Sequence, residues 1–243
     1  NGVAIEKNRL AFAIGRAFAH DPARLSDLYH EADAPEETLA ELIDRRATFL
    51  TGYQDVAYAQ SYTALLEVLR NALPSKGSDA LVTAAARSLF KLMAYKDEFE
   101  VARLLSDDSF KHQLEAEFDG DFRVNYHLAP PLLSRKTDAR GRPRKIQFGA
   151  WMRPALRLLA KGRRMRGSRW NPFGRHEEAR LHRDLLAWYQ TIITRAAEHY
   201  SHEHHDGWLK VLSAPMDLRG YGPVRMAAAE KVKAEVNARL ETL

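Results

Sequence analysis

Helical periodicity is the feature that most constrains the fold of this chain. Apolar residues recur at three- and four-residue spacings over most of the first 105 residues, and again from residue 152 to residue 240. This spacing places them on one face of an α-helix. We therefore predict a mainly α, bundle-like domain with long antiparallel helices. The expected helices cover residues 5–20, 35–73, 79–105, 152–165, 174–200, 202–212 and 223–240.

The helical pattern is interrupted once, between residues 122 and 148. Apolar and polar residues alternate over residues 122–128, which is the period of a β-strand. Residues 145–148 are a candidate partner strand. We therefore predict a small two-stranded β element within residues 122–148. A polar loop at residues 74–79 is the expected boundary between residues 1–75 and residues 76–243.

The absence of cysteine excludes several kinds of site. The chain forms no disulfide and offers no thiolate for an iron–sulfur cluster, a zinc ion or nucleophilic catalysis. No apolar run approaches the roughly 18 residues of a membrane-spanning helix. The chain starts with Asn1 and has no secretory leader pattern, so we expect a segment of a longer cytoplasmic protein.

Basic residues crowd the segment 134–170, where Asp138 is the only acid. The net charge of +5 also favours an anionic partner. Three hypotheses explain the run: a surface for a small anion or a partner, a nucleic-acid site, or a structural role for arginine stems. The candidate anion-facing residues are Arg144, Lys145, Arg163, Arg164 and Arg166.

A second polar cluster lies within the expected helix 79–105. The cluster consists of Lys96, Asp97, Glu98 and Arg103. Lys96 and Glu100 are four residues apart, so a helix would place them on the same face. We favour a buried or domain-facing ion-pair network. The alternative is an independent enzyme that uses this cluster and His127 for acid–base chemistry. A histidine-rich stretch, 199–205, has no thiol or carboxylate at a fixed spacing, so we predict no metal site.

Five segments resemble, in the same order, segments of one known protein family. They are RSLFKLMAYKDEFEVARLL (87–105), NYHLAPPLLSR (125–135), GRPRKIQFGAWMRPALRLLA (141–160), RGSRWNPFGRHEEARLHRDLLAWY (166–189) and LRGYGPVR (218–225). Together they resemble the C-terminal region of fused indolepyruvate ferredoxin oxidoreductases, of the 2-oxoacid:ferredoxin oxidoreductase superfamily. Residues 1–22 are similar to the end of the preceding γ-type domain of that family.

The resemblance implies a parent enzyme that oxidises a 2-oxoacid with thiamine diphosphate, Mg²⁺ and iron–sulfur clusters bound upstream. Residues 1–75 would then end the γ-type domain, and residues 76–243 would form an accessory domain without cofactor or catalytic residue. We expect this domain to pack on the upstream catalytic domains of a homodimer and to shape access for CoA or ferredoxin. We expect neither membrane nor nucleic-acid binding. The alternative is a free-standing helical module that binds an anion or nucleic acid.

Overall fold

A computed structural model describes residues 5–21, 37–74, 77–117, 123–129, 144–174, 176–220 and 222–243. The chain divides into two compact units, Asn1–Thr38 and Leu39–Leu243. This division differs from the boundary predicted at residues 75–76. The reason is that the helices on either side of that loop pack into one core. None of the described helices is long and apolar enough to span a lipid bilayer.

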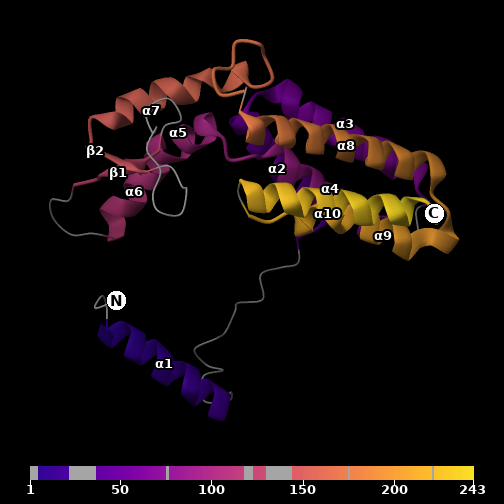
Figure 1. Cartoon of the computed structure of the whole chain (residues 1–243), viewed down its shortest axis with the longest axis horizontal. Helices are drawn as coiled ribbons and strands as arrows, with labels where there is room; N and C mark the ends of the chain where they lie inside the picture. The colour runs from indigo at the N-terminus through magenta and orange to yellow at the C-terminus, as the bar shows by residue number, and fades with distance from the viewer. Residues whose placement is uncertain are drawn as a thin grey trace. The chain divides into compact units, whose positions relative to one another are not determined.

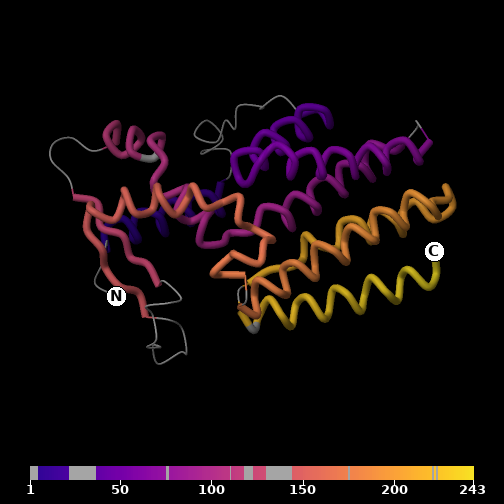
Figure 2. The backbone as a smooth tube through the Cα atoms, turned by 90° about the horizontal axis from the view of Figure 1, so that it is seen from above, coloured from indigo at the N-terminus to yellow at the C-terminus, as the bar shows by residue number. Residues whose placement is uncertain are grey.

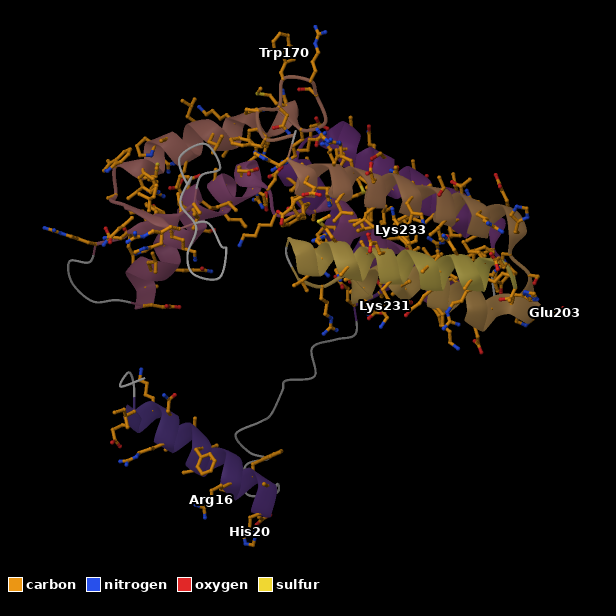
Figure 3. The ribbon with its side chains drawn as sticks, viewed as in Figure 1. Arg16, His20, Trp170, Glu203, Lys231 and Lys233 are labelled. Atoms are coloured by element: carbon orange, nitrogen blue, oxygen red, sulfur yellow. The ribbon has the colours of Figure 1, made fainter. Side chains whose placement is uncertain are left out.

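The first unit contributes one described helix, α1 (Ile5–His20), with the predicted bounds. The structure describes every residue of α1, and none of them is buried. Figure 3 labels Arg16 and His20, which lie in the C-terminal half of this helix. Its exposed large apolar residues are Ile5, Leu10, Phe12, Ile14 and Phe18. Leu10 and Phe12 are the most exposed of these side chains, at 62% and 70%.

The second unit is mainly α-helical with a small antiparallel sheet, as predicted. Its elements are α2 (Leu39–Tyr53), α3 (Val56–Ala72), α4 (Ser78–Met93), α5 (Glu98–Ser106), α6 (Asp108–Glu117), β1 (Tyr126–Leu128), β2 (Ile146–Phe148), α7 (Met152–Lys161), η2 (Gly162–Met165), α8 (Glu177–His199), η3 (His202–His204), α9 (His205–Ser213), η4 (Ala214–Asp217) and α10 (Pro223–Leu240). In the sheet, Tyr126 lies opposite Phe148, and Leu128 lies opposite Ile146.

Most of the buried apolar side chains form one cluster, here called the large core. It is built by α2, α3, α4, α8, α9 and α10, which lie together in Figure 1. Trp208, Tyr62 and Tyr189 are among its largest fully buried side chains. The Tyr189 hydroxyl donates to the Leu212 carbonyl at 2.6 Å, and the Tyr62 hydroxyl donates to the Ala86 carbonyl at 3.2 Å. These bonds satisfy phenol groups that burial removes from water.

A second cluster, the small core, lies at one end of the helical bundle in both views (Figures 1 and 2). It forms where α5 packs along α7 and against the sheet. Its buried members among the described residues are Ala102, Tyr126 and Leu156. Half-buried side chains complete it, including Leu128, Phe148 and Leu159.

Both predicted long helices are wrong in the same way, because each is broken at an aspartate. The predicted helix 35–73 is α2 followed by α3, and the Asp55 carboxylate accepts from the Tyr58 backbone N–H at 2.9 Å. The predicted helix 79–105 is α4 followed by α5, where the Asp97 carboxylate accepts from the Glu100 N–H at 2.8 Å. In each case the aspartate caps a new helix.

Candidate functional site

A pocket of about 320 Å³ lies beside the small core, where its elements meet the α4–α5 connection and the start of α8, and we call it the junction pocket. Its apolar walls come from α5, the end of β1, α7 and the turn before α8: Val101, Leu128, Ala129, Leu156, Leu159 and Phe173. Its polar residues come from the α4–α5 connection and the starts of α5 and α8: Tyr95, Lys96, Asp97, Glu98 and Glu178. Mostly apolar walls with a few polar groups are typical of small-molecule sites.

Arg166 and Asp97 form a two-pronged ion pair beside this pocket. Arg166 Nε lies 2.6 Å from Asp97 Oδ2, and Arg166 Nη2 lies 2.6 Å from Asp97 Oδ1. The side chains are only 7% and 16% exposed, respectively. Arg166 Nη1 also donates to the Tyr53 carbonyl, and the guanidinium lies 3.7 Å from the centre of the Tyr53 ring. One arginine therefore ties the start of α5 to the end of α2.

Two further contacts join the cores around this ion pair. Arg163 donates to the Gly52 carbonyl at the end of α2. The Phe99 ring meets the Phe173 ring edge-on, with centroids 5.4 Å apart. A Cβ atom added to Gly162 would lie 2.8 Å from the Phe99 ring, so η2 approaches this ring as closely as a glycine allows.

Glu98 is a half-buried carboxylic acid in the wall of the pocket. Within the described residues, its carboxylate takes part in no ion pair. Burial raises the pKa of the Glu98 carboxyl, and the nearby Asp97 and Glu178 carboxylates also raise it. His176 acts in the opposite direction. Glu98 is therefore a half-buried acid in a negative environment.

A second group of hydrogen bonds at the pocket involves Tyr95, Glu178 and Gly222. The Tyr95 hydroxyl donates to Glu178 Oε2 at 3.2 Å, and the Gly222 N–H donates to Glu178 Oε1 at 2.7 Å. Gly222 has φ of 55°, a backbone conformation that glycine adopts without strain. Burial raises the pKa of Tyr95 to about 12, so the phenol keeps its proton and remains a donor.

His182 stacks on Tyr95, with ring centroids 4.4 Å apart and an interplanar angle of 26°. The Arg225 guanidinium lies 5.3 Å from the Tyr95 ring centroid. Burial, together with the charges of Arg225 and Arg183, lowers the pKa of His182 to about 3. The imidazole is therefore neutral at physiological pH. These contacts connect the α4–α5 segment to α8 and α10.

The structure brings together only part of the predicted polar network. Lys96, Asp97 and Glu98 line the junction pocket, but Lys96 precedes the N-cap of α5 and is exposed. The predicted helical spacing between Lys96 and Glu100 is therefore wrong. Arg103 pairs with buried Glu100 instead, at 2.6 Å. His127 is exposed on β1 and does not line the pocket.

The basic run is divided between internal and solvent-facing roles. Arg163 and Arg166 bind groups inside the unit, whereas Arg144, Lys145 and Arg164 are exposed. Arg153 and Arg157 also pair with an acid, since both contact Asp108 at the start of α6. Trp170 projects outward from its loop and is 70% exposed (Figure 3). Residues 130–143 of the run lie outside the described residues.

Sequence reasoning missed Arg166 as the partner of Asp97 and missed the contribution of Tyr95 and Glu178. The two members of the ion pair are 69 residues apart, so no helical spacing connects them. A weak signal existed for Gly222, because a glycine just before Pro223 indicates a turn at a helix start.

In the parts of the chain that the structure describes, no group of three or more histidine and carboxylate side chains is arranged to hold a metal ion. Within the histidine-rich stretch, the Tyr200 hydroxyl lies 3.1 Å from His205 Nδ1. These side chains take part in local packing at the turn between α8 and α9, where the His202 and His205 rings lie 6.4 Å apart.

Comparison with known proteins gives one match. Residues 39–238 match DUF6537, which is described as a family of unknown function. Searches of curated proteins and of solved structures found no match. The matched region begins at Leu39, the first residue of the second unit, and includes both cores and the junction pocket. The chain therefore belongs to the DUF6537 family.

Proposed function

We propose that this chain is a non-catalytic accessory region of a cytoplasmic, thiamine diphosphate-dependent indolepyruvate (2-oxoacid) ferredoxin oxidoreductase. It would pack on the catalytic domains of the same protein, in a homodimer, and hold them in place. The link to this enzyme depends on the sequence resemblance, since the family match names no activity. The accessory role is argued from the geometry of the junction between the two cores.

The observation that carries the proposal is that all five resembling segments meet at the junction pocket. We call this pocket and the contacts that enclose it the joint. Each of them contributes to the junction pocket or to the contacts that enclose it: Tyr95 and Asp97 from the first, Leu128 from the second, Leu156 from the third, Arg166 and Glu178 from the fourth, and Gly222 from the fifth. The resemblance therefore concerns one structural joint. A joint that fixes the arrangement of two cores suits a scaffold.

The charged groups of the joint are mostly used for structure. Asp97 is held by Arg166, and Glu178 accepts from Tyr95 and from the Gly222 backbone. A general acid or base needs an unoccupied position next to its substrate. His127 lies outside the pocket that Lys96 and Glu98 line, so the structure does not bring these candidates for acid–base chemistry together. This arrangement favours the accessory role over the independent enzyme.

Helix α1 supports the expectation that the chain packs on further protein. It exposes large apolar side chains, including Phe12 at 70% and Leu10 at 62%. An isolated helix of 16 residues is only marginally stable in water, and apolar patches of this kind mark contact surfaces. In the parent enzyme the covering surface would be the upstream catalytic domains.

The test compares the enzyme that carries upstream domains with the same protein shortened to remove residues 39–243. We expect the shortened protein to keep bound thiamine diphosphate but to lose dimer stability in analytical ultracentrifugation. Like the shortening, an Arg166→Met change should lower the stability of the dimer. Arg164→Met, at an exposed position, should leave it unchanged. Full dimer stability and activity without residues 39–243 would contradict the proposal, as would 2-oxoacid oxidation by the isolated chain.

The exposed basic residues could also shape access for acidic CoA or ferredoxin, as the resemblance implies. Arg164 is suited to this test, because Arg163 and Arg166 bind internal groups and their loss would damage the fold. An Arg164→Glu enzyme should show a raised KM for ferredoxin or CoA with an unchanged kcat. If the Arg164→Glu enzyme and the unchanged enzyme have equal KM values for ferredoxin and for CoA, this part of the proposal is removed.

A free-standing anion-binding module is the second candidate. The observation that favours it is the exposure of Lys145, Arg164 and Arg169 together with Trp151 and Trp170. Such a surface would bind single-stranded nucleic acid with a strong salt dependence. A fluorescence titration of the isolated chain at low salt distinguishes the candidates. Salt-sensitive binding that is lost in a Trp170→Ala variant would favour the module.

A further inference from the structure

The junction pocket has the features of a ligand site, and its charges indicate which ligand it takes. We propose that the pocket binds a small organic cation, a primary amine carried on an apolar body, with Glu98 as its countercharge. This inference stands on the pocket alone and does not depend on the proposed function.

The walls of the pocket define the body of the ligand. A volume of about 320 Å³ is at the lower end of the range for small-molecule sites. Leu128, Leu156 and Leu159 form an aliphatic surface on the side of the small core, and Phe173 adds an aromatic ring. A hydrocarbon or aromatic group of modest size fits such walls and gains free energy from the apolar surface that it buries.

The charges of the pocket define the ligand's polar end. Of the charged side chains that line it, Asp97 is neutralised by Arg166, which leaves two carboxylates, Glu98 and the exposed Glu178, against one ammonium group, the exposed Lys96. Glu98 and Glu178 therefore leave the pocket with excess negative charge. A carboxylate ligand would be repelled by both, whereas a cation would be attracted. Burial is the main cause of the raised pKa of the Glu98 carboxyl, and the Asp97 and Glu178 carboxylates add to it.

The hydrogen-bonding groups favour an amine in particular. A primary ammonium group has three donors, and carboxylate oxygens are acceptors only. Both oxygens of Glu178 already accept, one from Tyr95 and one from Gly222, so this carboxylate is fixed in position. Glu98 makes no ion pair among the described residues, which leaves its carboxylate as the main partner for the ammonium group. Such charge-assisted hydrogen bonds are stronger than neutral ones.

The ligand would also touch both sides of the joint. Leu128 and Leu156 belong to the small core, while Tyr95 and Glu178 are tied to α8 and α10. A molecule that binds only when these parts are correctly arranged stabilises the folded chain by mass action. Thermal stabilisation by the amine is therefore a second readout, independent of the heat of binding.

The experiment uses three probes with the same phenyl body and different polar ends. Phenethylamine, phenethyl alcohol and phenylacetate are titrated into the full 243-residue chain by isothermal calorimetry. We expect the amine to bind with Kd of roughly 0.1–1 mM, as ligand efficiency allows for so small a molecule. We expect the alcohol and the carboxylate to bind at least about tenfold more weakly, because they lack the ion pair.

Three variants locate the binding. Glu98→Gln keeps the shape of the side chain and should weaken amine binding by at least about tenfold. Val101→Phe should abolish binding of the amine by filling the pocket. Glu230→Gln removes an exposed carboxylate from α10 and should leave amine binding unchanged. Circular dichroism confirms that each variant is folded, and Glu98→Gln carries the test if Val101→Phe does not fold.

Two kinds of result would overturn the inference. One is the absence of amine binding, by heat and by thermal shift, at concentrations up to about 10 mM. The other is binding that ignores the polar end of the probe or the Glu98→Gln change, which would mean nonspecific association. Nonspecific association would also be shown by amine binding that weakens equally in Glu98→Gln and Glu230→Gln, because such binding would depend on net charge alone.

Discussion

The two cores of the second unit are held together in different ways. The large core buries a continuous cluster of leucine, alanine, tyrosine and tryptophan side chains from its helices. The small core has few fully buried residues among those described, and it is attached to the large core by the contacts of Arg166 with Tyr53 and of Arg163 with the Gly52 carbonyl. Regions that bury little apolar surface are marginally stable on their own. The small core therefore depends on polar contacts that the large core does not need.

The largest expected effect comes from removing one side of the ion pair. Arg166→Met leaves Asp97 buried without its countercharge, which costs about 3–5 kcal/mol in such settings. We expect α5 and α7 to lose protection in hydrogen–deuterium exchange while α4 and α8 keep theirs. Arg164→Met, at an exposed position, should change stability by less than about 0.5 kcal/mol. Equal loss of protection in both cores would show that they unfold as one.

A cavity in the large core should lower the free energy of unfolding by a comparable or slightly smaller amount. The loss of hydrogen-exchange protection should be spread differently over the two cores. Leu89 is fully buried, and Leu89→Ala should lower the free energy of unfolding by about 2–5 kcal/mol. Urea denaturation followed by circular dichroism measures this change. Because the small core is attached to the large one, both should lose protection together. Protection lost in α4 alone would contradict the dependence of the small core on the large one.

Much of this fold can be predicted from sequence, but the joint cannot. The bounds of α1 and α10 follow from periodicity and from helix signals such as Pro223 at the first position of α10. The breaks at Asp55 and Asp97 do not follow, because an aspartate on the exposed face of a helix and an aspartate that caps a new one look alike in sequence.

The candidate site shows the same limit more strongly. Lys96, Asp97 and Glu98 were recognisable as an unusual polar cluster, and the structure places all three in the wall of the junction pocket. Their roles depend on residues that are distant in sequence, such as Arg166 and Glu178. The basic run was misleading for Arg163 and Arg166, since their charges are used inside the unit. Composition indicates a basic surface but not which guanidinium groups find internal partners.

A smaller effect is expected where η2 comes into close contact with α5. Gly162→Ala places a methyl group 2.8 Å from the Phe99 ring, and crowding of this kind costs about 1–3 kcal/mol. Gly52→Ala is the matched control, because nothing lies within 4 Å of its Cβ position within α2. This control should stabilise the protein by about 0.5–1 kcal/mol. Urea denaturation that gives the same sign for both variants would contradict close packing at Gly162.

The effect that is smallest near neutral pH is a pH dependence from His182. Its folded pKa is lowered to about 3 from an ordinary value of 6.5, so the unfolded state binds more protons between these values. Stability should therefore fall as pH is lowered from 6.5 toward 3, by at most about 1.4 kcal/mol per pH unit. His182→Phe keeps the stacking on Tyr95 and should lack this part of the pH dependence. Parallel stability–pH curves for the two proteins would show that His182 is not buried as a neutral group.

The measurement that tests the central claim most directly is a double-mutant cycle on Asp97 and Arg166. Asp97→Asn keeps the capping of α5, and Arg166→Met keeps part of the side-chain volume, so the cycle isolates the ion pair. Urea denaturation of the wild type, both single variants and the double variant gives the coupling energy. If the ion pair holds η2 and its Arg166 against the start of α5, the coupling should be at least about 1.5 kcal/mol. Additivity within about 0.5 kcal/mol would contradict the account.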